Sequence, residues 1–512
     1  MISGILTIKS ARSRLLLWGG LMAAVYLDYV LFFPLVPTIY SSGRVLDIEM
    51  QLRDGDRSIA LFYVLGLGLL FLAYWRMLKI VHTFSKENPE LAESLRIWVL
   101  GIGILCGTLL VGLYPITALD VVLYAVRSRL SVLYDVSPML ALPASFPQDP
   151  YIGFAGEYGR TLSPYGPLWE LVARIPVQIG FTEIAAGIVA MKAISLLSYF
   201  GMAGLLGWYA YQDKARYGVS AVTALTFFVL NPLVLLEAIG NGHNDMLMLA
   251  LITLGLVLWQ RDRWLGAAVV LTLAVLIKVT GLILLPLFGV AVLSAAPDWR
   301  TRFRRAVSIA AIYTVLTLAA YRLSGPFPEV FEGNLHAMVG RVGYTPTYAL
   351  RVLLRYLIPG RVDLIQLPTP LGSGLFVLFY IYLLAKLAKR QMTLIEAGFL
   401  AFFGQLLLGT TFRIWYPLWL IPFAALNLNS LTFWRTFLFS LTAELSILSY
   451  YILWRWHLSE WDWALTGPLE PYWDYWLVMT WLTVPWTFGI PVLVPLLIRR
   501  RNPEAFKNQL LI

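Results

Sequence analysis

The chain has 512 residues, of which 59% are hydrophobic and 13% carry a charge. This composition excludes a soluble globular protein and indicates a polytopic membrane protein. The formal net charge of +10 does not indicate nucleic-acid binding, because most basic residues stand in short segments between apolar runs, as membrane topology requires. The single cysteine, Cys106, lies inside an apolar run, which excludes a disulfide framework and a cysteine-based metal site.

The apolar runs predict an all-α bundle that forms one transmembrane domain over residues 1–512. Some of the shorter runs could be broken helices or half-helices, so the expected number of spans is about twelve to fourteen. The predicted spans are 15–40, 58–78, 96–117, 183–211, 218–239, 244–260, 264–280, 281–297, 306–323, 370–388, 391–411, 415–429, 435–453 and 474–497.

The distribution of Lys and Arg predicts that both termini are cytoplasmic. Four larger segments then lie outside: 41–57, 118–182, 324–369 and 454–473. The segment 118–182 is too long for a structureless loop, so we expect it to contain short helices that lie in the membrane interface. The clearest of these runs from Leu168 to Ile179, directly after Pro167, which suits the first turn of a helix.

Asp120 follows the outer end of a predicted span. A carboxylate in that position is costly to desolvate and usually faces a cavity, but it could equally be a helix cap. Arg127 follows seven residues later and could either bind an anionic group or mark the membrane interface.

The turn 241–245, with the sequence NGHND, joins two predicted spans on the outer side. Turn and capping chemistry explains the glycine, one asparagine and the aspartate. It does not explain five consecutive polar or glycine residues that include His243, one of four histidines in the chain. His243 is therefore a candidate catalytic group.

Two cations are candidate phosphate ligands on the outer side. Lys278 lies near the end of an otherwise apolar span, where it could also pair structurally with Glu237 or Asp245. Arg413 begins the run RIWYPLW, in which Tyr416 could stack on a sugar. The alternative for this run is an aromatic belt with one interfacial arginine.

Several of these motifs together resemble a known family. They are DVVLY at 120–124, SPYGPLW at 163–169, NPLVLL at 231–236, GHND at 242–245, Lys278 and WYP at 415–417. In this order they resemble the GT-C glycosyltransferases, and more narrowly the bacterial polyprenol-phosphate-mannose-dependent mannosyltransferases, including the alpha-1,6-mannosyltransferases of lipomannan synthesis. Family members often have an Asn-Pro-Tyr run after the aspartate helix, where this chain has SPM at 137–139.

The resemblance implies a GT-C-like bundle in the bacterial cytoplasmic membrane, with its active site on the extracytoplasmic face. It implies a polyprenyl-phosphate sugar, expected to be mannose, as donor and a lipid-linked or cell-envelope glycan as acceptor. It also implies that Asp120 is the general base. The residues expected to contact substrate are Tyr124, Arg127, Tyr165, Asn244, Asp245, Lys278, Arg413 and Tyr416.

Sugar transfer from a lipid phosphate needs a base for the acceptor hydroxyl and cations for the leaving phosphate. Asp120 would supply the base, with His243 as a second base or a phosphate ligand. The sequence has no P-loop and no set of His, Cys and carboxylate residues at metal-site spacing, so we expect neither a cofactor nor an obligatory metal. The family resemblance implies inversion of the configuration at the anomeric carbon of the sugar. The rival hypotheses are a transporter or flippase for a lipid-linked sugar, and a structural membrane protein.

Overall fold

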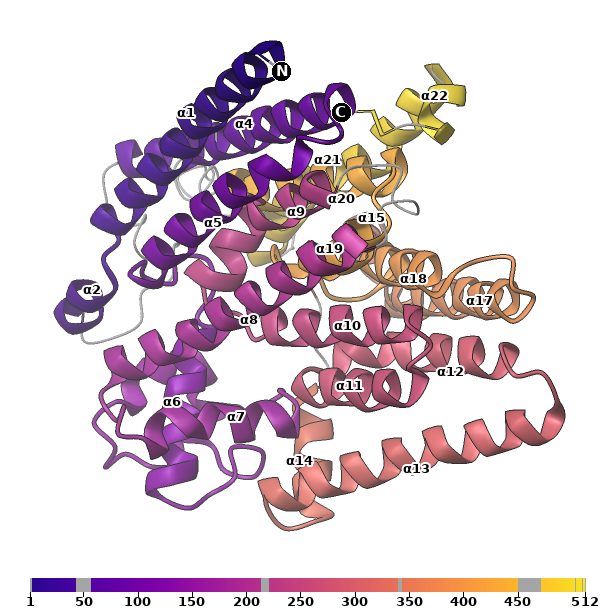
Figure 1. The fold of residues 1–512 in the computed structure, drawn as a ribbon. Coiled ribbons are helices and arrows are strands. Elements are labelled where there is room, and N and C mark those ends of the chain that lie inside the picture. The colour runs from indigo at the N-terminus through magenta and orange to yellow at the C-terminus, as the bar shows by residue number, and fades with distance from the viewer. Residues whose placement is uncertain are drawn as a thin grey trace. The chain divides into compact units, whose positions relative to one another are not determined.

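A computed structural model describes residues 2–42, 57–212, 221–338, 343–449, 471–501, 503–508 and 510–511 (Figure 1). Within these ranges the chain is helical and contains no strand, apart from an isolated bridge between Pro34 and Leu113. The predicted all-α polytopic fold class is therefore confirmed. Most of the predicted outer segments 41–57 and 454–473 lies outside the described residues.

Seven described helices are long and apolar enough to cross a membrane, and an eighth span results if one bent helix pair is counted. The seven are Ile8–Phe32, Leu61–Glu87, Ala92–Val111, Ile184–Gln212, Trp299–Ser324, Val362–Ala388 and Thr480–Arg501. Five further predicted spans correspond to apolar helices of 10–17 residues. The number of full-length spans is lower than predicted because these helices are shorter than the roughly 20 residues that a span needs.

Contacts divide the chain into two compact units. That residues 1–512 form a single domain stays a prediction. The first unit comprises Met1–Asp47 and Leu72–Val339, and the second comprises Ile48–Phe71 and Gly340–Ile512. The α-helices of the first unit are α1 (Ile2–Phe32), α2 (Leu35–Ser42), the end of α4 (Arg57–Glu87), α5 (Arg96–Val111), α6 (Asp120–Leu133), α7 (Pro167–Gln178), α8 (Ile184–Gln212), α9 (Ala221–Val229), α10 (Asp245–Gln260), α11 (Trp264–Ile277), α12 (Leu284–Ser294), α13 (Trp299–Ser324) and α14 (Glu329–Met338).

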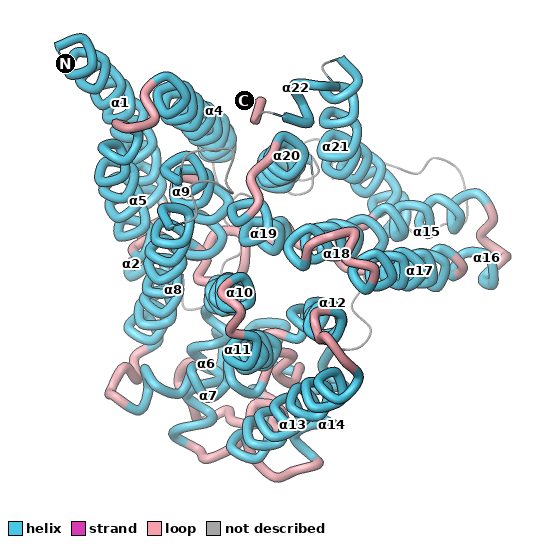
Figure 2. The backbone as a smooth tube through the Cα atoms, turned by 45° about the vertical axis from the view of Figure 1, so that its right-hand side comes forward, coloured by secondary structure: helices cyan, strands magenta, loops and turns pink. Residues whose placement is uncertain are grey.

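In the first unit, α10 packs against α11 and α8, and α1 packs against α5 (Figure 2). The approach of α10 to α11 depends on Gly255, because a Cβ at this position would overlap the side chain of Leu271. Helix α6 packs between α7 and α8. These contacts bring the C-terminal end of α11 to the N-terminal ends of α6 and α10.

Two local features of the first unit shape the site. Helix α7 begins with Pro167 at its first position and so confirms the helix predicted from Leu168 to Ile179. Helix α9 is followed by a π-helical turn, Val234–Gly240, at a bend of 53°. Pro232 lacks a backbone donor, and the Asn231 side chain accepts from Leu233 N at 3.0 Å, so the helical ladder breaks there.

The second unit contains α15 (Pro346–Leu357), α16 (Val362–Gln366), α17 (Pro368–Ala388), α18 (Leu394–Leu408), α19 (Ile421–Leu426), α20 (Ser430–Ile447), α21 (Pro471–Arg501) and α22 (Pro503–Asn508). Helix α20 packs on α21, and α17 packs on α18. Phe412, Phe439 and Phe488 form an aromatic cluster, with ring centroids 4.8–5.7 Å apart, that ties the segment before Tyr416 to α20 and α21.

Candidate functional site

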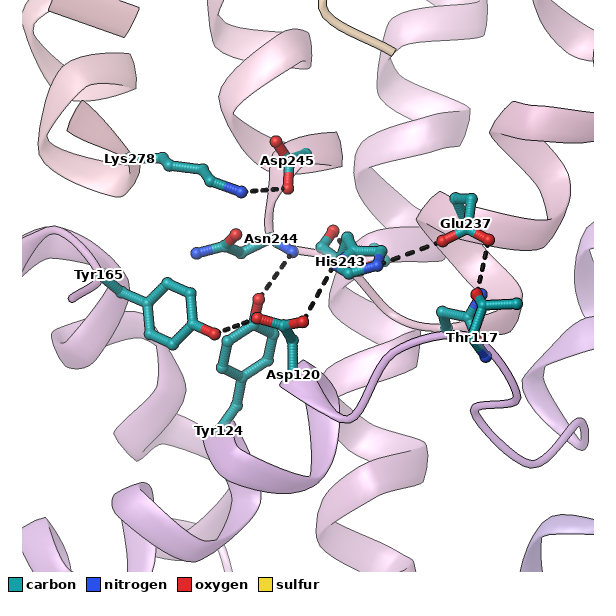
Figure 3. Close-up of polar contacts among 11 residues, drawn as sticks. Thr117, Asp120, Tyr124, Tyr165, Glu237, His243, Asn244, Asp245 and Lys278 are labelled. Atoms are coloured by element: carbon teal, nitrogen blue, oxygen red, sulfur yellow. Dashed lines mark hydrogen bonds and ion pairs between the residues drawn. The ribbon is translucent and has the colours of Figure 1, made fainter. Parts of the chain in front are cut away.

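Asp120 is the first residue of α6, and Leu119 is the N-cap. A carboxylate in the first turn is favoured by the partial positive charge at the start of a helix. Its Oδ1 accepts a hydrogen bond from the hydroxyl of Tyr165, and its Oδ2 lies 3.9 Å from Nδ1 of His243 (Figure 3). The Asp120 side chain is 22% exposed, so the carboxylate is held by two site residues and still reaches solvent.

His243 lies between two carboxylates. Its side chain is fully buried, with Nδ1 facing Asp120 and Nε2 placed 3.3 Å from Oε2 of Glu237. Glu237 is also fully buried and accepts a hydrogen bond at 2.6 Å from the hydroxyl of Thr117, in the segment just before α6. The backbone carbonyl of His243 accepts from Ser195 on α8 at 3.3 Å. The predicted turn 241–245 therefore forms part of a buried polar network.

Asp245 and Lys278 form an ion pair, with 2.6 Å between Oδ2 and Nζ. This contact selects Asp245 as the structural partner of Lys278, which the sequence left open between Asp245 and Glu237. Asp245 is fully buried, whereas the Lys278 side chain is 16% exposed. Lys278 follows α11 with extended backbone angles, which turn its side chain toward the start of α10.

Asn244 lies between this ion pair and Asp120, as Figure 3 shows. Its backbone N–H donates to the Tyr124 hydroxyl at 3.5 Å. Its side-chain amide is buried, and neither the oxygen nor the nitrogen has a hydrogen-bond partner among the described residues. A buried amide without partners is costly, and a contact of Asn244 with substrate stays a prediction.

The segment 161–166 is fixed from several sides. Asn334, fully buried on α14, donates to the backbone carbonyls of Ser163 at 3.0 Å and Tyr165 at 2.8 Å, and its own oxygen accepts from Tyr321. Gly166 N donates to Ile277 O at 3.0 Å. The ring of Tyr165 then meets Tyr124 edge-on at 4.8 Å between centroids. Together these contacts place the Tyr165 hydroxyl on Asp120.

Arg127 supports the same segment. Only 1% of it is exposed, and its Nη2 donates to the carbonyls of Thr161 and Leu162, each at 3.3 Å. The structure thus gives Arg127 contacts with the protein backbone, and a contact with substrate stays a prediction. Two helical positions later, Arg129 pairs with Asp149 at 2.9 Å and ties α6 to the following loop.

Arg413 and Tyr416 belong to the second unit. Both are half-buried, and Tyr416 stacks on Trp419 with 4.1 Å between ring centroids. The backbone N–H of Tyr416 donates to the carbonyl of Arg413 at 2.9 Å, so the two residues stand in one turn. Their predicted role in substrate binding stays a prediction.

Burial raises the pKa of two ionisable groups at the site. It raises the pKa of the Tyr124 phenol well above its usual value, and the nearby Tyr165, Asp120 and Asp245 raise it further. Burial also raises the pKa of Glu170, against the opposing influence of the Ser163 hydroxyl and of Arg127. Tyr124 is therefore a neutral phenol that can serve in hydrogen bonding.

The structure brings together seven of the predicted site residues, which come from four separate stretches of sequence. They are Asp120, Tyr124, Tyr165, His243, Asn244, Asp245 and Lys278. The sequence did not single out Thr117 or Asn334. Each is a single polar residue without a motif around it, and only its distant contacts reveal its role.

Comparison with known proteins finds relatives that are all described as mannopyranosyltransferases. An alpha-(1->6)-mannopyranosyltransferase A of Mycobacterium tuberculosis is 31% identical over 228 residues, which cover 44% of this chain and 41% of that protein. An alpha-(1->6)-mannopyranosyltransferase A of Corynebacterium glutamicum is 30% identical over 130 residues, covering 25% and 26%. A probable alpha-(1->6)-mannopyranosyltransferase of Mycolicibacterium smegmatis is 22% identical over 352 residues, covering 61% and 62%. The chain thus aligns with less than half the length of the first two relatives.

Residues 20–294 match the family described as alpha-(1->6)-mannopyranosyltransferase, N-terminal domain. This range contains the seven clustered residues, from Asp120 to Lys278, and leaves Arg413 and Tyr416 outside it. The match covers more than half of the 512 residues. The chain belongs to the alpha-(1->6)-mannopyranosyltransferase family.

Proposed function

We propose that this protein is a membrane glycosyltransferase that moves mannose from a polyprenyl-phosphate donor to a lipid-linked or cell-envelope glycan acceptor on the extracytoplasmic face. Family membership supports mannose as the sugar and an alpha-1,6 linkage as the product. The observation that carries the proposal is Asp120, a partly exposed carboxylate set among fully buried polar groups.

Asp120 is the proposed general base. It accepts the proton of the acceptor hydroxyl while that oxygen forms a bond to the anomeric carbon of the sugar. The bond between this carbon and the phosphate oxygen breaks, and the electron pair leaves with the lipid phosphate. Attack opposite the leaving group inverts the anomeric carbon. Tyr165 supports this role because its hydroxyl orients the carboxylate.

Lys278 is the proposed cation for the phosphate, with Arg413 as a second candidate. In Figure 3 the side chains of Lys278 and Asn244 both lie at the upper left, above the hydroxyl of Tyr124. The ion pair with Asp245 orients the ammonium group of Lys278, and its partial exposure leaves that group accessible. A monophosphate donor already carries its leaving group, so the proposed reaction requires no cofactor.

The Arg–aromatic pairs of the first unit support a proposed orientation in the membrane. Arginines lie over aromatic rings where α1 meets α5, where α5 meets α8, where α8 meets α10 and where α11 meets α13. The pairs are Arg12–Trp98, Arg96–Tyr211, Arg261–Trp208 and Arg305–Trp264, with 3.9–5.6 Å to the ring centroids. Arginine at one end of a helical bundle is typical of the cytoplasmic end, whereas aromatic rings are enriched at both membrane interfaces.

The clustered residues stand at the opposite ends of these same helices. Asp120 follows the C-terminal end of α5, His243 precedes α10, and Lys278 follows α11. We therefore propose that the cluster faces the extracytoplasmic side of the bacterial cytoplasmic membrane, and that the N-terminus is cytoplasmic. For the C-terminus, the proposal of a cytoplasmic location rests on the distribution of Lys and Arg along the sequence.

The deciding experiment uses purified protein in lipid nanodiscs with polyprenyl-phosphate mannose labelled in the sugar and a bacterial lipid extract as acceptor. Label in a new glycolipid supports transfer. A second assay uses the protein in proteoliposomes. Label that crosses their membrane without entering a new product supports a transporter instead. No movement of label in either assay contradicts both hypotheses for this donor.

A further inference from the structure

We propose that Glu237 is a positioning residue that fixes the ring tautomer of His243, so that His243 can take up the proton that Asp120 removes from the acceptor. This inference rests on the proposed function. From the sequence, Glu237 was a candidate only as a possible partner of Lys278. In the structure Lys278 pairs with Asp245 instead. A fully buried carboxylate facing a fully buried histidine needs another explanation, because burying charge is costly.

Two hydrogen bonds join Thr117 and Asn241 in a closed ring, and this ring holds Glu237. Its Oε1 accepts from the Thr117 hydroxyl at 2.6 Å, and that hydroxyl accepts from Asn241 Nδ2 at 2.5 Å. The Asn241 oxygen in turn accepts from Thr117 N at 3.3 Å. Thr117 stands three residues before Asp120, and Asn241 stands two residues before His243. The ring therefore fixes both partners of the Asp120–His243 contact relative to each other.

The π-helical turn Val234–Gly240 gives Glu237 its direction. Such turns widen the helix and redirect side chains, and they are frequent at functional sites. Here the turn follows the break at Asn231 and Pro232 and directs Oε2 of Glu237 to Nε2 of His243 at 3.3 Å. The other ring nitrogen, Nδ1, then faces Asp120.

The tautomer follows from hydrogen-bonding chemistry. A neutral imidazole carries one N–H, and the nitrogen that faces a carboxylate donates to it. Glu237 at 3.3 Å is closer to the ring than Asp120 at 3.9 Å. The proposed tautomer therefore carries its hydrogen on Nε2, the nitrogen nearer a carboxylate, and presents the lone pair of Nδ1 to Asp120. A buried carboxylate plays the same part toward histidine in serine proteases.

The proton passes from the acceptor to Asp120, then to His243, and finally to water. Asp120 accepts the proton of the acceptor hydroxyl during transfer, and the resulting carboxylic acid passes it to the lone pair on Nδ1 of His243. The charge of Glu237 stabilises the imidazolium that forms, and Glu237 itself takes no proton. Asp120 returns to its ionised state, and the proton leaves through Asp120 to water after product release.

The other charged or titratable groups around His243 are already engaged. Lys192 on α8, whose Cγ lies near Gly242, donates to the backbone carbonyl of Leu113. Asp245 is paired with Lys278, and the Tyr124 hydroxyl accepts from Asn244 N. Both ring nitrogens of His243 lie near carboxylates, Nδ1 near Asp120 and Nε2 near Glu237.

The first test is spectroscopic and independent of activity. The chain has four histidines, so ¹⁵N-histidine spectra in nanodiscs can be assigned to His243 by difference from His243→Gln. We expect the shifts of an Nε2–H tautomer in the wild type. In Glu237→Gln the amide can donate to Nε2, so the hydrogen moves to Nδ1. Unchanged His243 shifts in folded Glu237→Gln would overturn the proposal.

The second test is kinetic and uses a double-mutant cycle. Glu237→Gln should lower turnover roughly 10²-fold with little change in donor KM, because it affects proton transfer and not binding. In a His243→Gln background the same substitution should have no further effect, since Glu237 acts only through His243. Additive losses would assign Glu237 a role apart from His243.

Two controls keep these tests decisive. If Glu237→Gln does not fold, Thr117→Val removes one partner of Glu237 while Thr117→Ser keeps it, and only the valine variant should alter the His243 signal. If the wild-type protein transfers no mannose, the proposed function fails, while the ¹⁵N spectra still decide whether Glu237 sets the tautomer.

Discussion

Five carboxylates surround the candidate site, and their exposure separates them. The side chains of Glu237 and Asp245 are fully buried, and Asp149 and Glu170 are 3% exposed as residues. Of these five described carboxylates, Asp120, with a side chain that is 22% exposed, is the one that can meet a substrate without moving. At the scale of single residues, the burial of its neighbours therefore favours Asp120 as the base.

Replacing Asp120 by Asn should lower turnover by roughly 10²–10⁴, the usual contribution of a general base. The amide keeps the size of the side chain and can still accept from Tyr165, but it cannot take a proton. Transfer of labelled mannose, donor binding and thermal unfolding in detergent are the measurements. Donor binding and stability should change little. An Asp120→Asn protein with near-normal turnover would assign the base elsewhere, with His243 next in line.

Replacing Lys278 by Ala should weaken donor binding at least tenfold, because a charge-assisted contact with phosphate contributes roughly 1.5–3 kcal/mol. The single substitution also leaves buried Asp245 without its partner and should lower stability. The double variant Lys278→Ala/Asp245→Asn is the matched control. It should regain stability but not donor affinity. Recovery of affinity in the double variant would make the ion pair purely structural. Arg413→Ala, in the second unit, should weaken donor binding in the same way.

Residue types and motifs predicted most of the cluster but not its internal contacts. The turn 241–245 was identifiable because a histidine stands in a run of polar residues. The partner of Lys278 was ambiguous because Glu237 and Asp245 both lie on the preceding outer stretch. The π-helical turn directs the Glu237 side chain toward His243 and so leaves Asp245 as the partner of Lys278. Single-sequence periodicity contains no signal for such a turn.

At the scale of elements, the segment 161–166 packs closely against the backbone at the end of α11. A Cβ on Gly166 would overlap the backbone carbonyl of Leu276, although the φ angle of −69° suits any residue. The glycine is therefore required by the close approach of two chain segments and not by its conformation. Helix α7 was predictable from Pro167 alone, whereas the anchoring of this segment by α14 was not, because 171 residues separate Ser163 from Asn334.

Gly166→Ala should displace this segment and lower turnover at least tenfold, because the Tyr165 hydroxyl would move away from Asp120 and misplacement by about 1 Å can cost that much or more. Gly153→Ala is the matched control, since a Cβ there meets nothing within 4 Å. Mannose transfer and thermal unfolding of both variants are the measurements. Equal activity of the two variants would show that the segment adjusts without cost.

At the scale of the whole molecule, membrane orientation can be tested in the first unit. Gln178, at the end of α7, and Arg302, at the start of α13, are both exposed. In intact cells a membrane-impermeant maleimide should label Gln178→Cys, and it should label Arg302→Cys only after permeabilisation. The native Cys106 is buried and gives a low background. Labelling of position 302 from outside would reverse the proposed topology.

The short helices of the first unit have a consequence for how substrate arrives. At about 1.5 Å per residue, the 16 residues of α10 and the 14 residues of α11 reach about 24 and 21 Å. The hydrocarbon layer is about 30 Å thick. In the proposed orientation the arginine-flanked ends of these helices lie at one headgroup layer. The Asp245–Lys278 pair would then lie below the opposite layer, in a bilayer that thins around it. A polyprenyl-phosphate donor, as proposed, would therefore reach the reaction centre by lateral diffusion with its lipid tail still in the bilayer. The supply of sugar then depends on the number of donor molecules per membrane area.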